Sequence, residues 1–184
     1  MNAQSTNPQT DPNHSQNLPR AAALAELPPL AQLAYAACCG RRGQLVSPPD
    51  SQQQADAAEN AISLVEAHAA GDFATLVDIE KARGLIRSSN EPFENVCEQN
   101  DKEYYLSLTV AASWALHALW DVLRNPDYTA AAATPAEQVG VAVWQQTRRV
   151  EPFQRDFQSL TDHLGEATSN SDQPIPPTIF AELK

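Results

Sequence analysis

The sequence lacks any run of 18 or more consecutive apolar residues, which a membrane-spanning helix would need. Its first residues carry neither a basic region nor an apolar stretch, so we expect no secretory signal. Cysteine is scarce: the three residues are Cys38, Cys39 and Cys97, and an odd number argues for free thiols rather than a disulfide framework. These absences predict a cytoplasmic protein that does not bind a membrane.

Motifs of known chemistry are also missing. The sequence contains no His-Glu-x-x-His, no Gly-x-Ser-x-Gly, no Gly-x-Gly-x-x-Gly and no P-loop, and it lacks the Glu-x-x-His that a di-iron bundle needs. The adjacent pair Cys38-Cys39 has neither the spacing of a redox pair nor that of metal ligands. We expect structural thiols there, although Arg41 and Arg42 would lower the pKa of a partly exposed Cys39. We therefore predict no metal and no cofactor.

Basic residues are also scarce. The chain has 12 basic and 23 acidic residues, a net charge of −11, and residues 50–103 hold twelve of the acidic residues but four of the basic ones. A surface of that sign repels phosphate backbones, which argues against a nucleic-acid partner. The acidity serves either solubility or the capture of a basic protein.

One domain is expected from the 184 residues. Residues 1–19 are polar and proline-rich and predict a disordered tail, and residues 20–165 predict the folded domain. Residues 166–184 predict a mostly disordered tail with an apolar end made of Ile179, Phe180 and Leu183. That end docks either on its own domain or on a partner.

The first half of the domain shows three helical patterns. One covers residues 29–42, after a proline pair, and is ended by Gly43. A second runs from a cap at Asp50 or Ser51 to residue 70, with Gly71 after it and a glutamine placed for a capping box. A third starts at an Asp72 cap, and its buried side is expected to hold Phe73, Leu76, Val77, Ile79 and Ile86. The last two are expected to form an antiparallel hairpin.

The second half begins with a short helical stretch, from the Asn90-Glu91-Pro92 break to residue 100. The strongest pattern covers residues 101–124 and is apolar around most of its circumference, as in a central helix. A final helix starts at a capping box of Thr134 and Glu137 and is broken at Pro152, before apolar residues that reach Gly165. The predicted fold is a single all-α antiparallel bundle of five to six helices with a central alanine-rich helix.

Three segments resemble the YjaG-like family of small, uncharacterised, all-helical bacterial proteins. Residues 26–41 read ELPPLAQLAYAACCGR and resemble the family's opening L-P-x-x-x-x-L-A-F-A-x-x-C-C-E-R. Residues 115–119 and 152–157 resemble its A-A-x-x-x-x-Y-A-L-E-x-L and P-x-x-Q-R-E-L segments. Gly40 replaces the acidic residue of C-C-E-R, and residues 123–126 replace the family's D-G-D-P turn with LRNP. The resemblance implies a fold and no activity.

The chain is also similar to all-α immunity proteins of bacterial polymorphic toxin systems, with which it shares alanine-rich helices and a central helix of small residues. This second resemblance implies a role, which is to bind and neutralise a toxin.

Two sets of residues are candidate sites. Trp114, His117, Trp120 and Asp121 place a histidine–carboxylate pair between aromatic side chains, which suits a small ligand or acid–base chemistry. The simpler interpretation is that this pair lies on a helix surface and contacts solvent. The second set comprises the acidic residues Glu59, Glu66, Glu94, Glu98 and Asp101, which suit a basic partner. Arg148, Arg149 and Arg155 form a basic spot that either binds a partner or pairs with the chain's own acidic middle.

The leading hypothesis is a non-enzymatic protein that binds another protein, such as a basic one, through an acidic helical surface, as an immunity-type antagonist does. A small-molecule binder or enzyme with a pocket near His117 and Asp121 is the first alternative, and a self-associating structural subunit is the second. The sequence leaves the oligomeric state open.

Overall fold

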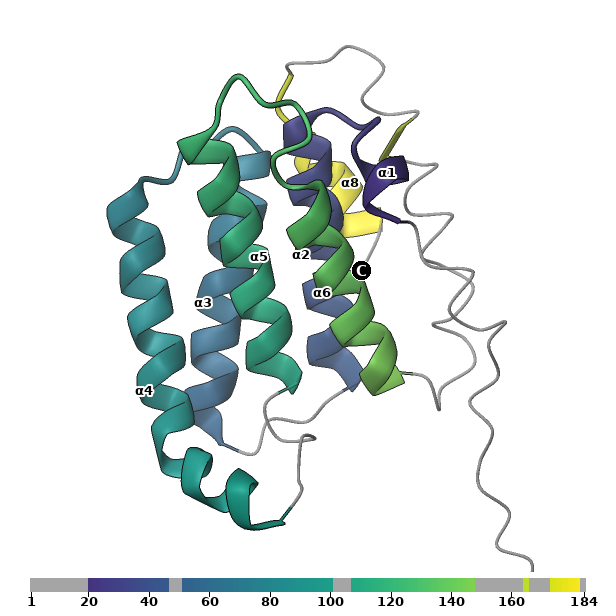
Figure 1. Cartoon of the computed structure of the whole chain (residues 1–184). Helices are drawn as coiled ribbons and strands as arrows, with labels where there is room; N and C mark the ends of the chain where they lie inside the picture. Colours follow the sequence, from purple (N-terminus) through teal and green to yellow (C-terminus); the bar gives the residue numbers. More distant parts are fainter. Residues whose placement is uncertain (1–19, 47–50, 101–106, 148–163, 166–172, 183–184) are drawn as a thin grey trace, which may run out of the picture.

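The computed structural model of the chain describes residues 20–46, 51–100, 107–147, 164–165 and 173–182 (Figure 1). The long helices are α2 (Pro29–Val46), α3 (Gln52–Ala69), α4 (Leu76–Asn100), α5 (Ser107–Arg124) and α6 (Ala133–Thr147), and the short ones are α1 (Ala21–Leu24) and α8 (Pro177–Glu182). No strand occurs within these ranges, which confirms the predicted all-α fold. No helix in the described ranges combines the length and apolar character needed to span a membrane.

The long helices form a bundle in which each runs opposite to the one before it (Figure 1). As predicted, α5 lies at the centre, where it packs against α2, α3, α4 and α6. Helix α2 shares that central position, because every residue from 31 to 40 is buried. Helix α4 lies at one edge and packs against α3 and α5. The sequence does not predict how deeply α2 is buried.

Helix α2 continues past its predicted end. The sequence predicts a stop at Gly43, but the helix runs to Val46 with Gly40 and Gly43 buried inside it. A β-carbon at position 40 would overlap the Ile62 side chain of α3, so the glycine allows a close approach of the two helices. The predicted stop is wrong because packing outweighs the low helix propensity of glycine.

Both ends of α3 agree with the prediction. The Ser51 hydroxyl accepts a hydrogen bond from the Gln54 backbone N–H at 3.1 Å and caps the N-terminus. Gly71 follows the C-terminus with φ of 102°, a conformation that glycine adopts without strain. The Gln54 side chain does not complete a capping box, because its amide donates to Asn90 of α4 at 3.3 Å. Helices α3 and α4 form the predicted antiparallel hairpin (Figure 1).

The cap of α4 is Thr75, not Asp72 as the sequence predicts. The Thr75 N–H donates to the Asp78 carboxylate at 2.9 Å, and the Asp78 N–H donates to the Thr75 hydroxyl at 3.3 Å. This is a reciprocal capping box with aspartate at the third helical position. The helix begins after Thr75 rather than after Asp72 because the Thr75–Asp78 box satisfies two backbone N–H groups at once.

The late start of α4 changes which side chains are buried. Ile79 and Ile86 are buried, as predicted. Phe73 and Val77 are 74% and 62% exposed, so the prediction that they are buried is wrong. Phe73 precedes the helix and is not part of its apolar stripe, and Val77 lies away from the stripe that holds the two isoleucines.

Helix α4 also passes through the predicted break at Asn90-Glu91-Pro92 and ends at Asn100. Its last turns run at an angle to the rest of the helix (Figure 1). A proline inside a helix removes one backbone donor and clashes with the preceding turn, so Pro92 accounts for a bend rather than an end. The prediction of two separate helical segments is therefore wrong.

Helix α6 begins at Ala133, before the predicted cap Thr134. Glu137 does not form the predicted capping box, because its carboxylate accepts from the Ala21 N–H at 3.1 Å and thereby holds the start of α1. Arg20 lies 3.5 Å from the same carboxylate. Of the elements predicted beyond α6, residues 148–163 lie outside the described ranges, and Leu164 is buried.

The apolar end of the chain docks on its own bundle. Ile175, Ile179 and Phe180 are buried, and the Ile175 N–H donates to the Ala69 carbonyl of α3 at 2.8 Å. A β-carbon at Gly71 would lie 3.0 Å from Pro174, so this segment covers the turn between α3 and α4. Residues 1–19 and Leu183 lie outside the described part of the chain.

Candidate functional site

Negative charge is concentrated on the α3–α4 hairpin, residues 51–100. This segment contains nine acidic residues and three basic ones. Residues 20–46 and 107–147, the other described long stretches, contain four acidic and four basic residues. The fold therefore places an acidic hairpin at one edge of the bundle (Figure 1), while the two other long described stretches together carry no net charge.

The hairpin exposes both charged and apolar side chains. Its exposed acidic residues include Asp56, Glu59, Asp72, Glu80 and Glu91. It also exposes three large apolar side chains, those of Phe73, Val77 and Leu85, of which the last is 47% exposed. A surface that exposes both charged and large apolar side chains has the general composition of a protein-binding surface.

Two of the predicted partner-binding residues are bound within the chain. Glu59 and Glu66 lie two turns apart on one face of α3, as predicted, and both contact Arg41 of α2. The Arg41 Nε donates to Glu66 at 2.9 Å, its Nη1 donates to Glu59, and its Nη2 donates to the Ser63 hydroxyl at 2.8 Å. The hydrogen bond from Arg41 lowers the pKa of Glu59. This face of α3 is therefore partly neutralised.

The other predicted partner-binding residues extend beyond the described side chains. Glu94 and Glu98 belong to the last turns of α4, for which the structure describes the helix path but not the side chains. Asp101 lies outside the described ranges, and so does the basic spot of Arg148, Arg149 and Arg155.

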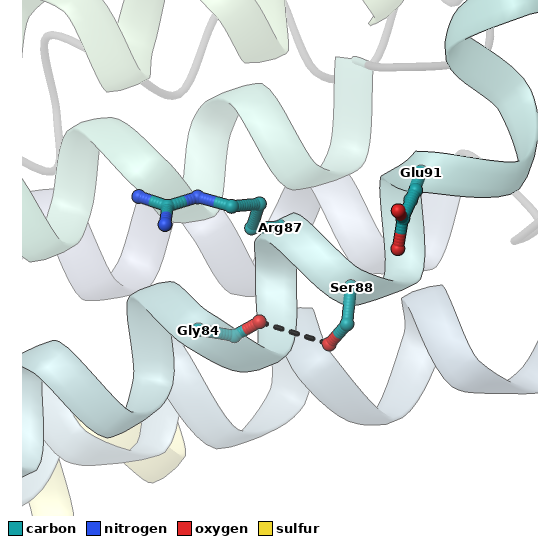
Figure 2. A pocket seen from close by; sticks show the side chains of 4 residues that line it. All are labelled: Gly84, Arg87, Ser88 and Glu91. Carbon is teal, nitrogen blue, oxygen red and sulfur yellow. Dashed lines mark hydrogen bonds between the residues drawn. The ribbon is translucent and has the colours of Figure 1, made fainter.

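A shallow, open depression of about 350 Å³ lies on the outer face of α4 and is lined by Gly84, Arg87, Ser88 and Glu91 (Figure 2). A β-carbon at Gly84 would have no neighbour within 4 Å, so the fold itself does not require glycine there. The Ser88 hydroxyl donates to the Gly84 carbonyl at 2.9 Å, while the Arg87 and Glu91 side chains point in different directions (Figure 2). This depression is not predicted from the sequence. The feature that could have indicated it is Gly84, a glycine inside a helical pattern.

Three of the four predicted ligand-binding residues share a stripe of α5. The rings of Trp114 and His117 lie 5.7 Å apart at an interplanar angle of 54°. The His117 Nε2 lies 3.5 Å from the Asp121 Oδ2, and the His117 side chain is 49% exposed. An exposed pair four residues apart contributes little to stability, and its imidazole is open to solvent.

Trp120 contacts a different group of residues. The guanidinium carbon of Arg83, on α4, lies 4.5 Å from the centre of a Trp120 ring, and that of Arg124 lies 5.7 Å away. These are cation–π distances. Trp120 therefore joins α5 to α4 and stands apart from the Trp114, His117 and Asp121 stripe.

Cys38 and Cys39 are buried and form no disulfide, as predicted for thiols with a structural role. Burial raises the pKa of Cys39 to about 12. The alternative, a partly exposed Cys39 activated by its arginine neighbours, is therefore wrong, because desolvation of the thiolate outweighs the nearby positive charge. The Cys97 side chain lies outside those described.

Sequence reasoning missed a buried polar stripe on α2, formed by Gln32, Tyr35, Cys39 and Arg42. Their spacings of three, four and three place them on one side of the helix. A polar residue within an apolar pattern is weak evidence for a buried polar site. In an alanine-rich helix, such a residue is normally predicted to lie at the surface. The structure shows instead that all four are buried.

Among the described residues, no group of three or more histidine, cysteine, aspartate or glutamate side chains is arranged to hold a metal ion. No known family model matches the chain, and neither a curated protein nor a solved structure is detectably similar to it. The resemblances to the YjaG-like family and to immunity proteins therefore stay predictions.

Proposed function

We propose that this protein acts by binding a basic protein through the outer surface of the α3–α4 hairpin, without catalysing a reaction. The observation that carries the proposal is the division of charge: nine acidic and three basic residues on the hairpin, against four and four on the other long described stretches. A one-sided distribution of charge steers an oppositely charged partner to that side and raises the rate of encounter.

The α4 side of the hairpin offers exposed apolar area to a partner, and the α3 side offers most of the acidic excess among the described side chains. On the α3 side, Arg41 already neutralises part of the charge of Glu59 and Glu66. On α4, Glu80 and Glu91 are exposed together with Val77 and Leu85, but the basic Lys81 and Arg87 are exposed there too, and Glu80 pairs with Arg83 at 3.1 Å. Apolar side chains supply buried area in a complex, and the charges around them set orientation and specificity.

Antagonism of a toxin, as the resemblance to immunity proteins implies, is one form of this function. Such an antagonist needs a charged, preformed surface and no reactive group of its own. The acidic hairpin supports this reading for a basic toxin.

A pair of charge-reversal variants tests the proposal. Glu80→Lys with Glu91→Lys reverses two charges on the hairpin, and Glu26→Lys with Asp127→Lys makes the same change in net charge elsewhere on the exposed surface. Each tagged full-length chain is used to capture proteins from a lysate of its source cells. Captured proteins are identified by mass spectrometry, and binding of the purified partner is measured by calorimetry at two salt concentrations.

The expected result is a basic partner that binds the wild-type chain and the control variant but binds the hairpin variant at least about tenfold more weakly, since charge pairs at the edge of an interface contribute of order 1 kcal/mol. Added salt should weaken wild-type binding. Equal recovery of the same proteins by all three chains would contradict the proposal.

A further inference from the structure

Three buried polar atoms without a hydrogen-bond partner lie on one side of α2. They are the Gln32 Oε1, the Tyr35 Oη and the Arg42 Nη1, and no other side-chain nitrogen or oxygen of the described residues is in this state. Native proteins leave few buried polar groups unpaired, and each such group calls for a water, an ion or a functional role. Three on a single helical stripe therefore point to a guest molecule or to water.

The chemistry of the three atoms differs along the stripe. The Gln32 amide nitrogen is satisfied, because it donates to the Leu27 carbonyl at 2.7 Å and to the Thr129 carbonyl at 2.8 Å. Its unpaired atom is an acceptor. The unpaired atoms of Tyr35 and Arg42 are a hydroxyl and a guanidinium nitrogen, and both are able to donate. The Arg42 end of the stripe therefore presents two donors and a positive charge.

Within the described ranges, no carboxylate forms an ion pair with Arg42. Glu137 acts electrostatically on Tyr35, but its carboxylate accepts from the Ala21 N–H and contacts Arg20. The Cys39 thiol interacts weakly with the Tyr35 hydroxyl, and burial keeps that thiol neutral by raising its pKa to about 12. Leaving the buried Nη1 of a guanidinium without a hydrogen-bond acceptor is unfavourable.

We propose that Arg42 and Tyr35 bind a small oxyanion, a carboxylate or inorganic phosphate, at the Arg42 end of the polar stripe of α2. A guanidinium pairs with such groups through short, charge-assisted hydrogen bonds, and the phenol provides a second donor. Arg42 is 9% exposed, so the ligand enters at the Arg42 end of the stripe. On the other side, a β-carbon at Gly140 of α6 would lie 2.7 Å from the Tyr35 Oη, so α6 closes the stripe there. The inference is independent of the proposed function.

The test measures how the midpoint of thermal unfolding, Tm, of the full chain responds to added sodium acetate, phosphate or chloride at constant ionic strength. Arg42→Met removes the charge and keeps the length of the side chain, and Tyr35→Phe removes the hydroxyl alone. Arg87→Met, at an exposed position, is the matched control. Calorimetric titration of the wild-type chain with the same anions measures affinity directly and does not require any variant to fold.

The expected result is a Tm that rises by about 5 °C or more at a hundredfold excess of acetate or phosphate over its Kd, in the wild-type chain and in Arg87→Met. The response should disappear in Arg42→Met, and Tyr35→Phe should bind about fivefold more weakly. The anion that binds more tightly shows whether the site prefers a carboxylate or a phosphate.

Two outcomes would overturn the proposal. One is the absence of binding heat and of any Tm response to acetate and phosphate, or a response to chloride alone. The other is an Arg42→Met variant that responds to the anions as the wild-type chain does, since Arg42 would then not contact them.

Discussion

Gly40 of α2 lies directly against Ile62 of α3, so closely that a β-carbon at position 40 would overlap the Ile62 Cδ1 methyl group. Ile62 is almost fully buried and has little freedom to move aside. The contact explains how two alanine-rich helices approach closely enough to form a core from small side chains.

We predict opposite effects of alanine at two helical glycines. Gly40→Ala should lower the free energy of unfolding by about 1–3 kcal/mol, because it overpacks the contact with Ile62. Gly84→Ala should raise it by up to about 1 kcal/mol, because a β-carbon there meets no neighbour and alanine favours the helix. Urea unfolding followed by circular dichroism measures both. A Gly40→Ala variant as stable as Gly84→Ala would show that α2 and α3 are farther apart.

Replacement of Arg41 by glutamine should destabilise the protein at neutral pH by about 1 kcal/mol, since it leaves two carboxylates of α3 without their cation. Because the folded-state pKa of Glu59 is lowered, its pairing stabilises the fold above the unfolded pKa of about 4.3 and is lost as the pH falls below that value. Urea unfolding at neutral and acidic pH should therefore show a shallower acid dependence in Arg41→Gln than in the wild-type chain. Arg87→Gln is the control, and an equally steep dependence in both variants would refute the assignment.

His68 should make the fold less stable in mild acid. Its Nδ1 accepts the Ala74 N–H at 3.1 Å, and burial lowers its pKa. The folded state therefore favours the neutral imidazole, so stability is complete above the unfolded pKa of about 6.5 and falls as the pH drops through and below it.

In His68→Asn, which keeps an acceptor near the Nδ1 position, this loss of stability between neutral and mildly acidic pH should be absent. The same comparison made with the exposed His117→Gln should leave the loss in place. Midpoints of urea unfolding across that pH range provide the measurement, and an unchanged profile in His68→Asn would rule out the role of His68.

Removal of the Phe180 ring should cost about 3 kcal/mol of the free energy of unfolding, because the side chain is almost fully buried where α8 docks on the bundle. Thr178→Ala, at an exposed position of the same short helix, should change stability by less than about 0.5 kcal/mol. Equal stabilities of Phe180→Ala and Thr178→Ala in urea would mean that α8 is not bound in solution.

The parts of the fold that the sequence predicts well depend on local chemistry. The Ser51 cap, the Gly71 turn and the apolar stripe of α5 are each determined by residues within a few positions of one another. The wrong boundaries have distant causes. The Glu137 carboxylate accepts a hydrogen bond from the Ala21 N–H, so it does not cap α6. Packing against other helices keeps α2 helical beyond Gly43.

The candidate sites were harder to predict for the same reason. The sequence places Glu59 and Glu66 on one face, but it does not show that Arg41 of another helix binds both. The unpaired atoms of Tyr35 and Arg42 depend on what α6 places opposite them, which no spacing within α2 reveals.

The docking of α8 has a consequence for the order of events during synthesis. Among the described residues, the segment that covers the turn after α3 is the one in which the Ile175 N–H bonds to the Ala69 carbonyl, and roughly a hundred residues separate these two residues. At a translation rate of about 5–20 residues per second, the ribosome needs roughly 5–20 seconds to make that stretch. During this interval the turn between α3 and α4 is not yet covered by the segment that contains Ile175. The α8 contacts of the native bundle therefore form only after α8 has left the exit tunnel.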